Sequence, residues 1–337
     1  MSEINKQLII LGATGRIGVY LTLHFKELGY DVIACGHRKN DNGFFSDWNI
    51  PYISIDIENP ADFDKLPQEG VFAVLDFAGM LPASMKGYDP NAYVKSIIQG
   101  TMNVLEYCRK TNVDRIIFPQ TLFDISYKFG STVPIPADSL RIPPKDGDHA
   151  VYVICKNAAV DLIEHYYHAY GIKRFIFRLS RVYMYEPTPF TYKDGEKIWV
   201  SDRLLIYKAM KGEDIEMWGD PEILLETVNI YDFCQIIQKA VESPTNGGLY
   251  NIGSGGTTLK ERLEGIIEVF SPDNNKSKII PVPDKKIGRQ FVLDISKTKS
   301  ELGYKPSVSW IEYLRRFKKE MELQRFAKLW GKEEDYI

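Results

Sequence analysis

The sequence predicts an α/β protein built on a doubly wound parallel β-sheet, with a smaller C-terminal domain beside it. Short apolar segments alternate with helix-length segments through the first half of the chain. Strands that are separated by helices imply a parallel sheet with helices on both faces. A glycine-rich turn directly after the first apolar segment supports the same interpretation.

The predicted strands of the first half are short and largely apolar. The first, residues 7–11, is the kind of continuous apolar run that a strand buried on both faces shows. The next stretch places Ile17, Leu21 and Leu28 on one helical face. Further strands are predicted at residues 31–35, 52–56, 71–77, 115–118 and 174–179, and helices at 92–111 and from 151 onward.

The pattern changes after about Tyr183. Two strand-like segments, 226–230 and 248–252, are expected to return to the main sheet. The remaining elements are helices at residues 201–212, 257–270 and 310–330, joined by polar or proline-rich loops. We therefore expect one domain of residues 1–182, with 226–252 returning to it, and a second, cap-like domain of residues 183–225 and 253–337.

The composition is that of a soluble globular protein. The chain has 337 residues, of which 44% are apolar and 26% charged. Lys and Arg number 42 against 45 Asp and Glu, so the net charge is −3. This nearly balanced charge gives the chain no electrostatic reason to bind nucleic acid or an anionic membrane.

The cysteine usage and the N-terminus favour the cytoplasm. The four cysteines are far apart in the sequence, which suits a reducing compartment and excludes a CxxC pair. No apolar run approaches the ~18 residues of a membrane span, and the first residues do not have the pattern of a signal peptide. His165 and His168 lie three residues apart, but no carboxylate or cysteine cluster completes a metal site, so we expect no metal.

The glycine-rich turn predicts a Rossmann-type dinucleotide site. Gly12, Gly15 and Gly18 lie between a strand and a helix. Such glycines permit a tight turn, let a pyrophosphate approach the backbone, and let helix and strand pack closely. The helix N-terminus then offers unpaired N–H groups to the phosphates.

The end of the second strand decides between the two nicotinamide dinucleotides. An acidic residue there would bind the ribose hydroxyls of NAD, but the segment contains His37 and Arg38 instead. These side chains can hold a 2′-phosphate by charge-assisted hydrogen bonds, so NADP is favoured over NAD. Asp56, at the same edge, can accept a hydrogen bond from the adenine amino group.

Tyr152 and Lys156 stand one turn apart on a predicted helix. A free tyrosine has a pKa near ~10, and lowering it to neutrality requires about 4 kcal/mol. An ammonium group ~4 Å away supplies about that much at an effective dielectric constant of ~20. Thr121 follows a strand that ends in polar residues, where it can polarise a substrate oxygen.

Together these residues resemble the extended short-chain dehydrogenase/reductases, in particular the NAD(P)-dependent epimerase/dehydratase family. The similarity covers nearly the whole chain. Its further markers are Phe77-Ala78-Gly79, Gly100-Thr101, Arg178-Leu179-Ser180, Tyr250-Asn251-Ile252-Gly253 and Leu302-Gly303-Tyr304.

The resemblance implies a Thr–Tyr–Lys triad of Thr121, Tyr152 and Lys156, with a nucleotide sugar bound between the domains. The cofactor-binding residues it implies, beyond the triad's Tyr152 and Lys156, are Gly12, Thr14, Gly15, Arg16, Ile17, Gly18, His37, Arg38, Asp56, Ile57, Ala78 and Gly79. The substrate-binding residues it implies are Leu81, Ser84, Arg181 and Arg289.

Several residues depart from the family pattern on the substrate side. Leu122-Phe123 stand where sugar-nucleotide dehydratases carry an Asp-Glu pair, so we expect no dehydratase of that type. Leu225 replaces an arginine that often binds the substrate diphosphate, and Arg181 replaces an asparagine. Arg181 either supplies another anion contact or pairs with a surface acid.

Three functions therefore stay open. The chain is an epimerase or oxidoreductase of a sugar-like substrate, an NADPH-dependent reductase of a ketone without a nucleotide, or a non-catalytic NAD(P)-binding redox sensor. We also expect a homodimer, formed through helices 92–111 and 151–170. In relatives these helices make a four-helix interface, and the expected exposed side chains are Val160, Ile163 and Tyr167.

Overall fold

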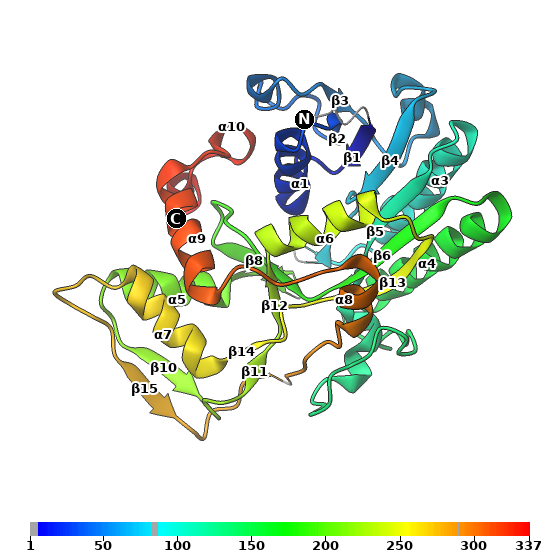
Figure 1. Ribbon diagram of the computed structural model, residues 1–337. Helices are drawn as coiled ribbons and strands as arrows, with labels where there is room; N and C mark the ends of the chain where they lie inside the picture. The colour runs from blue at the N-terminus through cyan, green and yellow to red at the C-terminus, as the bar shows by residue number, and fades with distance from the viewer. Residues whose placement is uncertain (1–5, 83–86, 148, 194, 289) are drawn as a thin grey trace.

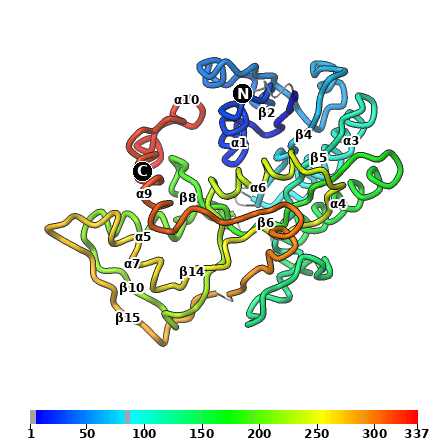
Figure 2. Tube along the Cα trace, in the orientation of Figure 1, coloured from blue at the N-terminus to red at the C-terminus, as the bar shows by residue number. Residues whose placement is uncertain are grey.

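The computed structural model describes residues 6–82, 87–147, 149–193, 195–288 and 290–337. A large sheet with its helices occupies one side of the molecule, and a smaller group of helices and short strands occupies the other (Figure 1). The Cα trace shows that the chain extends from the smaller group towards its first helix shortly before its C-terminus and then turns back (Figure 2).

The main sheet has seven parallel strands in the order β13-β6-β5-β4-β1-β2-β3. The chain enters at the middle and builds outwards in both directions, which confirms the predicted doubly wound sheet. The strands are β1 (Gln7–Leu11), β2 (Asp31–Gly36), β3 (Tyr52–Ser54), β4 (Val71–Asp76), β5 (Arg115–Thr121), β6 (Lys173–Leu179) and β13 (Gly247–Ile252).

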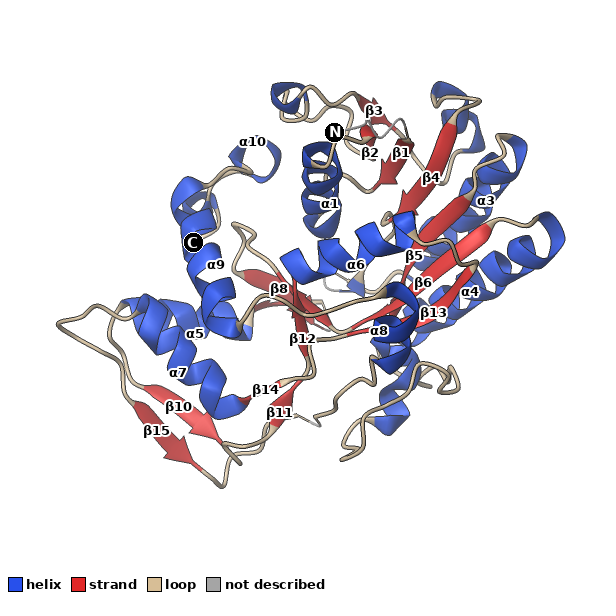
Figure 3. Ribbon diagram, viewed as in Figure 1, coloured by secondary structure: helices blue, strands red, loops and turns tan. Residues whose placement is uncertain are grey.

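Helices cover both faces of this sheet (Figure 3). Successive residues of β1 alternate between the faces: Leu8 and Ile10 join one buried cluster, and Ile9 and Leu11 join the other. One face is covered by α1 (Arg16–Glu27) and α6 (Ile230–Glu242). The other is covered by a π-helical turn, η4 (Val94–Gln99), by α3 (Gly100–Lys110) and by α4 (Ala150–Tyr170).

The two segments expected to rejoin the sheet behave differently. The segment at 248–252 does so as β13, which pairs with β6 at the sheet edge. The prediction for 226–230 is wrong, because β12 (Thr227–Asn229) pairs with β7 (Arg181–Tyr183) in a separate two-stranded sheet. The Asn229 side chain accepts a hydrogen bond from the amide of Asp232, so this strand leads directly into α6.

The C-terminal elements pack beside the carboxyl ends of the sheet strands. Two-stranded pairings and three helices form this part. The helices are α5 (Ser201–Met210), α7 (Leu259–Phe270) and α9 (Trp310–Leu323). The paired strands are β8 (Phe190–Lys193) with β9 (Glu196–Trp199), β10 (Ile215–Trp218) with β15 (Ile279–Val282), and β11 (Leu224–Leu225) with β14 (Thr257–Thr258); α8 (Ser296–Leu302) packs on β13.

The single helix predicted at 310–330 is wrong, because the structure divides it. Helix α9 ends at Gln324, which adopts the left-handed conformation with φ of 44°. A short helix, α10 (Ala327–Trp330), follows after the turn. After this turn α10 extends towards α1, and the end of the chain returns to lie beside α9 (Figure 1).

Two of the three side chains expected to be exposed at a dimer interface are buried, whereas the third, Tyr167, is partly exposed. Val160 and Ile163 are only 2% and 1% exposed, because both pack into the core between α4 and the sheet. The exposed apolar side chains on these helices include Ile154 on α4 and Val94 on η4. Within the described part of the chain, no helix combines the length and apolar character of a bilayer span.

Candidate active site

A cleft of about 770 Å³ runs along the carboxyl ends of the sheet strands, between the sheet and the cap. Its walls come from the turn after β1, the ends of β2, β4 and β5, the first turn of α4, and cap residues such as Val182 and Pro187. The structure brings together these residues singled out in the sequence: Gly12, Thr14, Gly15, Arg16, Ile17, Gly18, His37, Arg38, Asp56, Ile57, Ala78, Gly79, Leu81, Thr121, Tyr152 and Lys156.

Two positions of the first turn have no room for a side chain and therefore require glycine. Gly12 has φ of 79°, and a Cβ there would lie 2.6 Å from the carbonyl oxygen of Phe77. A Cβ at Gly18 would collide with the carbonyl of Gly12. The glycines therefore let α1 begin directly against the ends of β1 and β4, which forms one wall of the cleft.

The N-terminus of α1 is chemically suited to an anion. Gly15 is the N-cap residue, no side chain caps the helix, and its first turn contains no acidic residue. Its first N–H groups are therefore left for an outside partner, and the helix dipole adds positive potential. This arrangement fits the pyrophosphate of a dinucleotide. Arg16, the first residue of the helix, is ion-paired with Glu186 of the cap.

The residues at the end of β2 lie beside this helix N-terminus. His37 is largely exposed, and its ring nitrogen lies 3.8 Å from a carboxylate oxygen of Asp56. The Arg38 guanidinium donates a hydrogen bond to the backbone carbonyl of Leu329, near the end of the chain. Both side chains line the cleft, but each already has a protein partner.

Thr121 and Tyr152 both line the cleft. Thr121 is the last residue of β5, and Tyr152 lies in the first turn of α4. Both residues are 8% exposed, and the Thr121 hydroxyl accepts a hydrogen bond from the amide of Phe123 at 3.2 Å. Burial raises the pKa of the Tyr152 phenol, and the Thr121 hydroxyl opposes part of that rise.

Lys156 lies one turn further along α4 and is 4% exposed. Its ammonium donates to the Pro119 carbonyl at 2.9 Å and lies 4.2 Å from the centre of the Phe118 ring. Burial lowers the pKa of Lys156 to about 8, against an opposing effect of Asp76. The groups that shift the pKa of Tyr152 here do not include Lys156, whose ammonium is bonded to the end of β5, so the lowering of that pKa by Lys156 stays a prediction.

Asp76 is a buried carboxyl group that the sequence analysis did not single out. It is the last residue of β4 and is 1% exposed. Burial raises its pKa to about 6, while the Lys156 charge and the Ala78 amide oppose that rise. Within the described residues, one oxygen of this carboxyl group has no hydrogen-bond partner. An acid and a base are thus buried together beneath the cleft.

Gln120 connects the end of β5 to α4. Its side-chain oxygen accepts from the amide of Thr121 at 2.8 Å, and its nitrogen donates to Asn157 at 2.8 Å. Beneath it, Asp124 and Arg178 form an ion pair with two hydrogen bonds of 2.8 and 2.9 Å, and both side chains are fully buried. This network fixes the position of Thr121 relative to the helix that carries Tyr152.

Of the four residues expected to bind substrate, one lines the cleft, one does not, and two lie outside the described residues. Leu81 lines the cleft. Arg181 is not among the lining residues and pairs with Asp202 at 3.3 Å, the second of the two alternatives that the sequence left open. Ser84 and Arg289 lie outside the described residues. Among the described lining residues, the cationic and imidazole side chains are Arg16, His37, Arg38 and Lys156, none of which comes from the cap.

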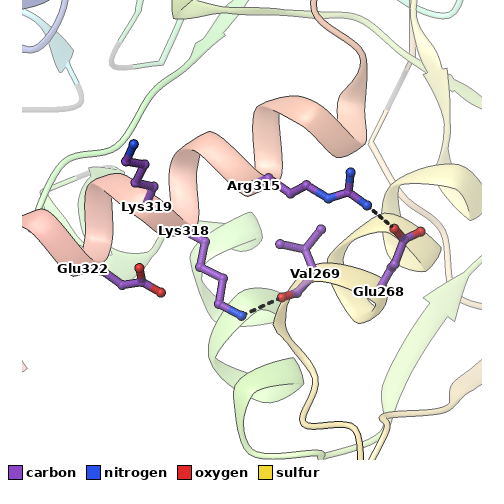
Figure 4. A pocket seen from close by; sticks show the side chains of 6 residues that line it. All are labelled: Glu268, Val269, Arg315, Lys318, Lys319 and Glu322. Carbon is purple, nitrogen blue, oxygen red and sulfur yellow. Dashed lines mark hydrogen bonds and ion pairs between the residues drawn. The ribbon is translucent and has the colours of Figure 1, made fainter.

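A second, smaller depression lies between α7 and α9 and shares no lining residue with the cleft (Figure 4). Its volume is about 460 Å³. Arg315 pairs with Glu268 at 2.9 Å, and Lys318 donates to the carbonyl of Val269 at 2.9 Å. Paired, solvent-exposed charges of this kind are typical of a surface groove between two helices.

Several cleft residues were missed by sequence reasoning. Trp330, Tyr336 and Glu186 line the cleft although they lie in the C-terminal segment or in the cap. No local pattern marks them, because only the tertiary fold brings them to the glycine-rich turn. Asp76 did carry a signal, since an acidic residue at the end of an otherwise apolar strand is unusual.

An uncapped helix N-terminus packed against glycines, at the carboxyl edge of a parallel sheet, defines a dinucleotide-binding α/β protein. Residues 8–253 match the model of the NAD dependent epimerase/dehydratase family. The chain therefore belongs to this family and is an NAD-dependent enzyme of the extended short-chain dehydrogenase/reductase type.

The sequence similarity to individual relatives extends along almost the whole chain. A putative UDP-glucose 4-epimerase of Methanocaldococcus jannaschii is 25% identical, with 92% of this chain and 96% of that protein covered. A dTDP-glucose 4,6-dehydratase of Xanthomonas campestris is 25% identical, with 90% and 89% covered.

Solved structures show the same fold. The UDP-glucose 4-epimerase of Thermotoga maritima, solved with UDP-glucose, has a TM-score of 0.71 and 23% identity, with 94% of this chain and 99% of that one covered. The UDP-glucuronic acid 4-epimerase of Bacillus cereus, solved with NAD, has a TM-score of 0.69 and 21% identity, with the same coverage.

Proposed function

We propose that this protein is an NAD(P)-dependent epimerase of a nucleotide sugar, with Thr121, Tyr152 and Lys156 as its catalytic residues. The observation that carries the proposal is that Thr121, at the end of β5, and Tyr152 and Lys156, at the start of α4, line one cleft together with the glycine-rich turn. The named activities of the relatives support the choice of substrate class, since they include a UDP-glucose 4-epimerase and a UDP-glucuronic acid 4-epimerase.

The cofactor would lie along the carboxyl edge of the sheet. The N-terminus of α1, together with Gly12 and Gly15, would hold the pyrophosphate, and Asp56 would face the adenine. Lys156 would hold the nicotinamide ribose. When bound, the nicotinamide supplies a hydride acceptor and donor next to the substrate carbon.

The protein's own side chains would handle the proton. Tyr152 would accept the proton of the substrate hydroxyl through its phenolic oxygen, and Thr121 would donate a hydrogen bond to the same substrate oxygen. Since burial raises the pKa of Tyr152, proton acceptance needs positive charge nearby. Lys156 and an oxidised cofactor are the groups that can provide it.

A Tyr152→Phe variant tests this proposal. It keeps the ring that packs 5.7 Å from Tyr93 but removes the hydroxyl. We expect kcat for interconversion of UDP-glucose and UDP-galactose, or of another nucleotide sugar that the wild type accepts, to fall by about 10²- to 10⁴-fold. Binding of NAD, measured by calorimetry, should stay within a few-fold. Unchanged turnover would show that the phenol takes no part.

A second candidate is an NADPH-dependent reductase of a ketone without a diphosphate. The specific observation in its favour is the cap side of the cleft, which is lined by Val182, Met184 and Pro187. The cap arginines Arg203 and Arg262 are occupied by internal partners, at Glu333 and at Tyr183. Multiple turnovers that consume NADPH with a simple ketone, without nucleotide-sugar epimerisation, would favour this function.

A redox sensor without catalysis is the remaining alternative. Such a protein would need the dinucleotide cleft but not Thr121, Tyr152 and Lys156 together. The Tyr152→Phe variant would leave its response to NAD or NADH unchanged. The expectations of NADP preference, of a homodimer and of a cytoplasmic location stay predictions.

A further inference from the structure

We infer that residues 325–336 complete the dinucleotide site, with Trp330 and Tyr336 forming its outer wall and retaining the bound cofactor. We call these residues the C-terminal strap. The inference rests on the proposed dinucleotide binding and adds to it a segment that lies outside the glycine-rich motif and outside the region matched by the family model, residues 8–253.

The strap is anchored in the core of the first domain. Phe326 is 1% exposed, and its ring lies 4.8 Å from that of Tyr20 on α1 and 4.8 Å from that of Trp330. Leu329 is 2% exposed. Buried aromatic and aliphatic side chains hold a segment far more firmly than surface charges do, so the path of the strap is defined.

Polar contacts then fix the strap to the cofactor-binding loops. The indole N–H of Trp330 donates to the carbonyl of Thr14, inside the glycine-rich turn, at 2.9 Å. The Arg38 guanidinium donates to the carbonyl of Leu329, and the Asn42 amide donates to the carbonyl of Lys328 at 2.8 Å. The strap thus contacts both loops that would hold the adenosine half of a dinucleotide.

The far end of the strap is attached to the cap. The Glu333 carboxylate pairs with Arg203 at 2.9 Å and accepts hydrogen bonds from the hydroxyls of Tyr185 and Tyr207. Next to Tyr185, Glu186 pairs with Arg16 at the start of α1. The strap therefore bridges the cap and the sheet domain across one end of the cleft.

Trp330 and Tyr336 are the strap residues that line the cleft itself. The Tyr336 hydroxyl donates to the backbone carbonyl of Trp330, which fixes the Tyr336 side chain to this part of the strap. Aromatic rings at this place can pack on the adenine or on its ribose. A dinucleotide held under this wall would leave slowly, which suits an enzyme that reduces and reoxidises the same cofactor molecule.

Trp330 gives a direct test. In the full-length protein, we expect Trp330→Ala to raise the Kd for NADH and for ADP by about tenfold or more, and to speed NADH release in stopped-flow fluorescence. Binding of nicotinamide mononucleotide should not change, because the strap lies at the adenosine end. Trp330→Phe, which keeps a ring but loses the indole N–H, should have a smaller effect.

The matched control is Trp218→Ala, since Trp218 is 42% exposed on β10, bonds to Glu216 at 2.7 Å, lies under the ammonium of Lys285 and does not line the cleft. Hydrogen exchange on the wild type gives a second readout that needs no variant: NAD should increase amide protection in residues 326–336. ADP and NADH affinities of both Trp330 variants within twofold of the wild type, or no added protection with NAD, would overturn the inference. A wild type that binds neither NAD nor NADP would instead refute the proposed function.

Discussion

The Lys156 ammonium donates a hydrogen bond to the backbone carbonyl of Pro119, 2.9 Å away, and is thereby held at the end of β5. It shares this buried space with Asp76 on the neighbouring strand β4. The groups that act on the Tyr152 phenol within the described structure are Thr121 and Tyr93. The charge of Lys156 is therefore set by Asp76 and by burial before any ligand enters.

The pH dependence of activity should report this pair. Burial lowers the pKa of Lys156 to about 8, so the ammonium form, which the proposed mechanism needs, is lost as the pH rises through that value. We expect kcat/KM to decline above pH 8. Asp76→Asn removes the negative charge that raises the pKa of Lys156, so the decline should move to lower pH. Glu268→Gln, in the groove between α7 and α9, is the control and should keep the wild-type pH profile. If the profile of Asp76→Asn also superimposes on that of the wild type, Asp76 does not act on Lys156.

Thr121→Val should separate binding from chemistry. The substitution keeps the branched shape at the end of β5 but removes the hydroxyl that opposes the raised pKa of Tyr152. We expect kcat to fall by roughly tenfold to a hundredfold, since one hydrogen bond to the reacting oxygen is lost. The Kd for NAD should hold. A fall in NAD affinity with no change in kcat would assign Thr121 to the cofactor rather than to the substrate.

The Asp124–Arg178 pair should matter for stability. Both side chains are fully buried and joined by two hydrogen bonds. Asp124→Ala leaves the Arg178 charge without its carboxylate, and we expect the free energy of unfolding in urea to fall by about 3–5 kcal/mol. A double variant, Asp124→Leu with Arg178→Met, should recover part of that loss. Equal losses in the single and double variants would argue against an unpaired charge as the cause.

A homodimer through α4 and η4 should depend on Ile154. This side chain is 49% exposed although it is large and apolar. Sedimentation velocity should show a dimer for the wild type at micromolar concentration and a shift towards monomer for Ile154→Glu. Ile280→Glu, on β15, where the side chain is 42% exposed, should leave the dimer intact. A monomeric wild type would contradict the prediction.

Arg38 tests the expected preference for NADP. If its guanidinium holds a 2′-phosphate while bonded to Leu329, Arg38→Ala should weaken NADP binding by about tenfold and leave NAD binding nearly unchanged. Calorimetric titration with both dinucleotides measures the ratio of their Kd values in each variant. Lys39→Ala, at the exposed neighbouring position, is the control. Equal loss for both dinucleotides would mean that Arg38 acts through the strap instead.

The parts of the fold that the sequence predicted are those that local patterns control. Buried parallel strands such as β1 and β4 are continuous apolar runs, and the turn at Gly12 and Gly18 needs glycine for reasons of space. The prediction placed strand β12 in the main sheet because its composition suits a strand. In the structure its three residues pair with β7 instead and end at Asn229, the N-cap residue of α6.

The parts that escaped prediction depend on tertiary contacts. The break at Gln324 has no glycine or proline to signal it. Trp330 reaches Thr14 across more than three hundred residues of sequence, and no spacing rule connects them. Val160 and Ile163 looked like interface residues, but the face of α4 that packs on the sheet buries both. The lysine–tyrosine spacing was visible, yet the direction of the Lys156 side chain was decided by Pro119 and Asp76.

The most direct measurement mixes the NAD-loaded protein rapidly with nucleotide sugars and follows the absorbance of reduced nicotinamide. We suggest UDP-glucose, UDP-galactose and dTDP-glucose as probes. A hydride-transferring epimerase with Tyr152 as its base should show reduced cofactor within a single turnover for at least one of them, and Tyr152→Phe should abolish that signal. A fully loaded wild type that gives no reduced cofactor with any nucleotide sugar, while still binding one of them in the cleft, would contradict the central claim.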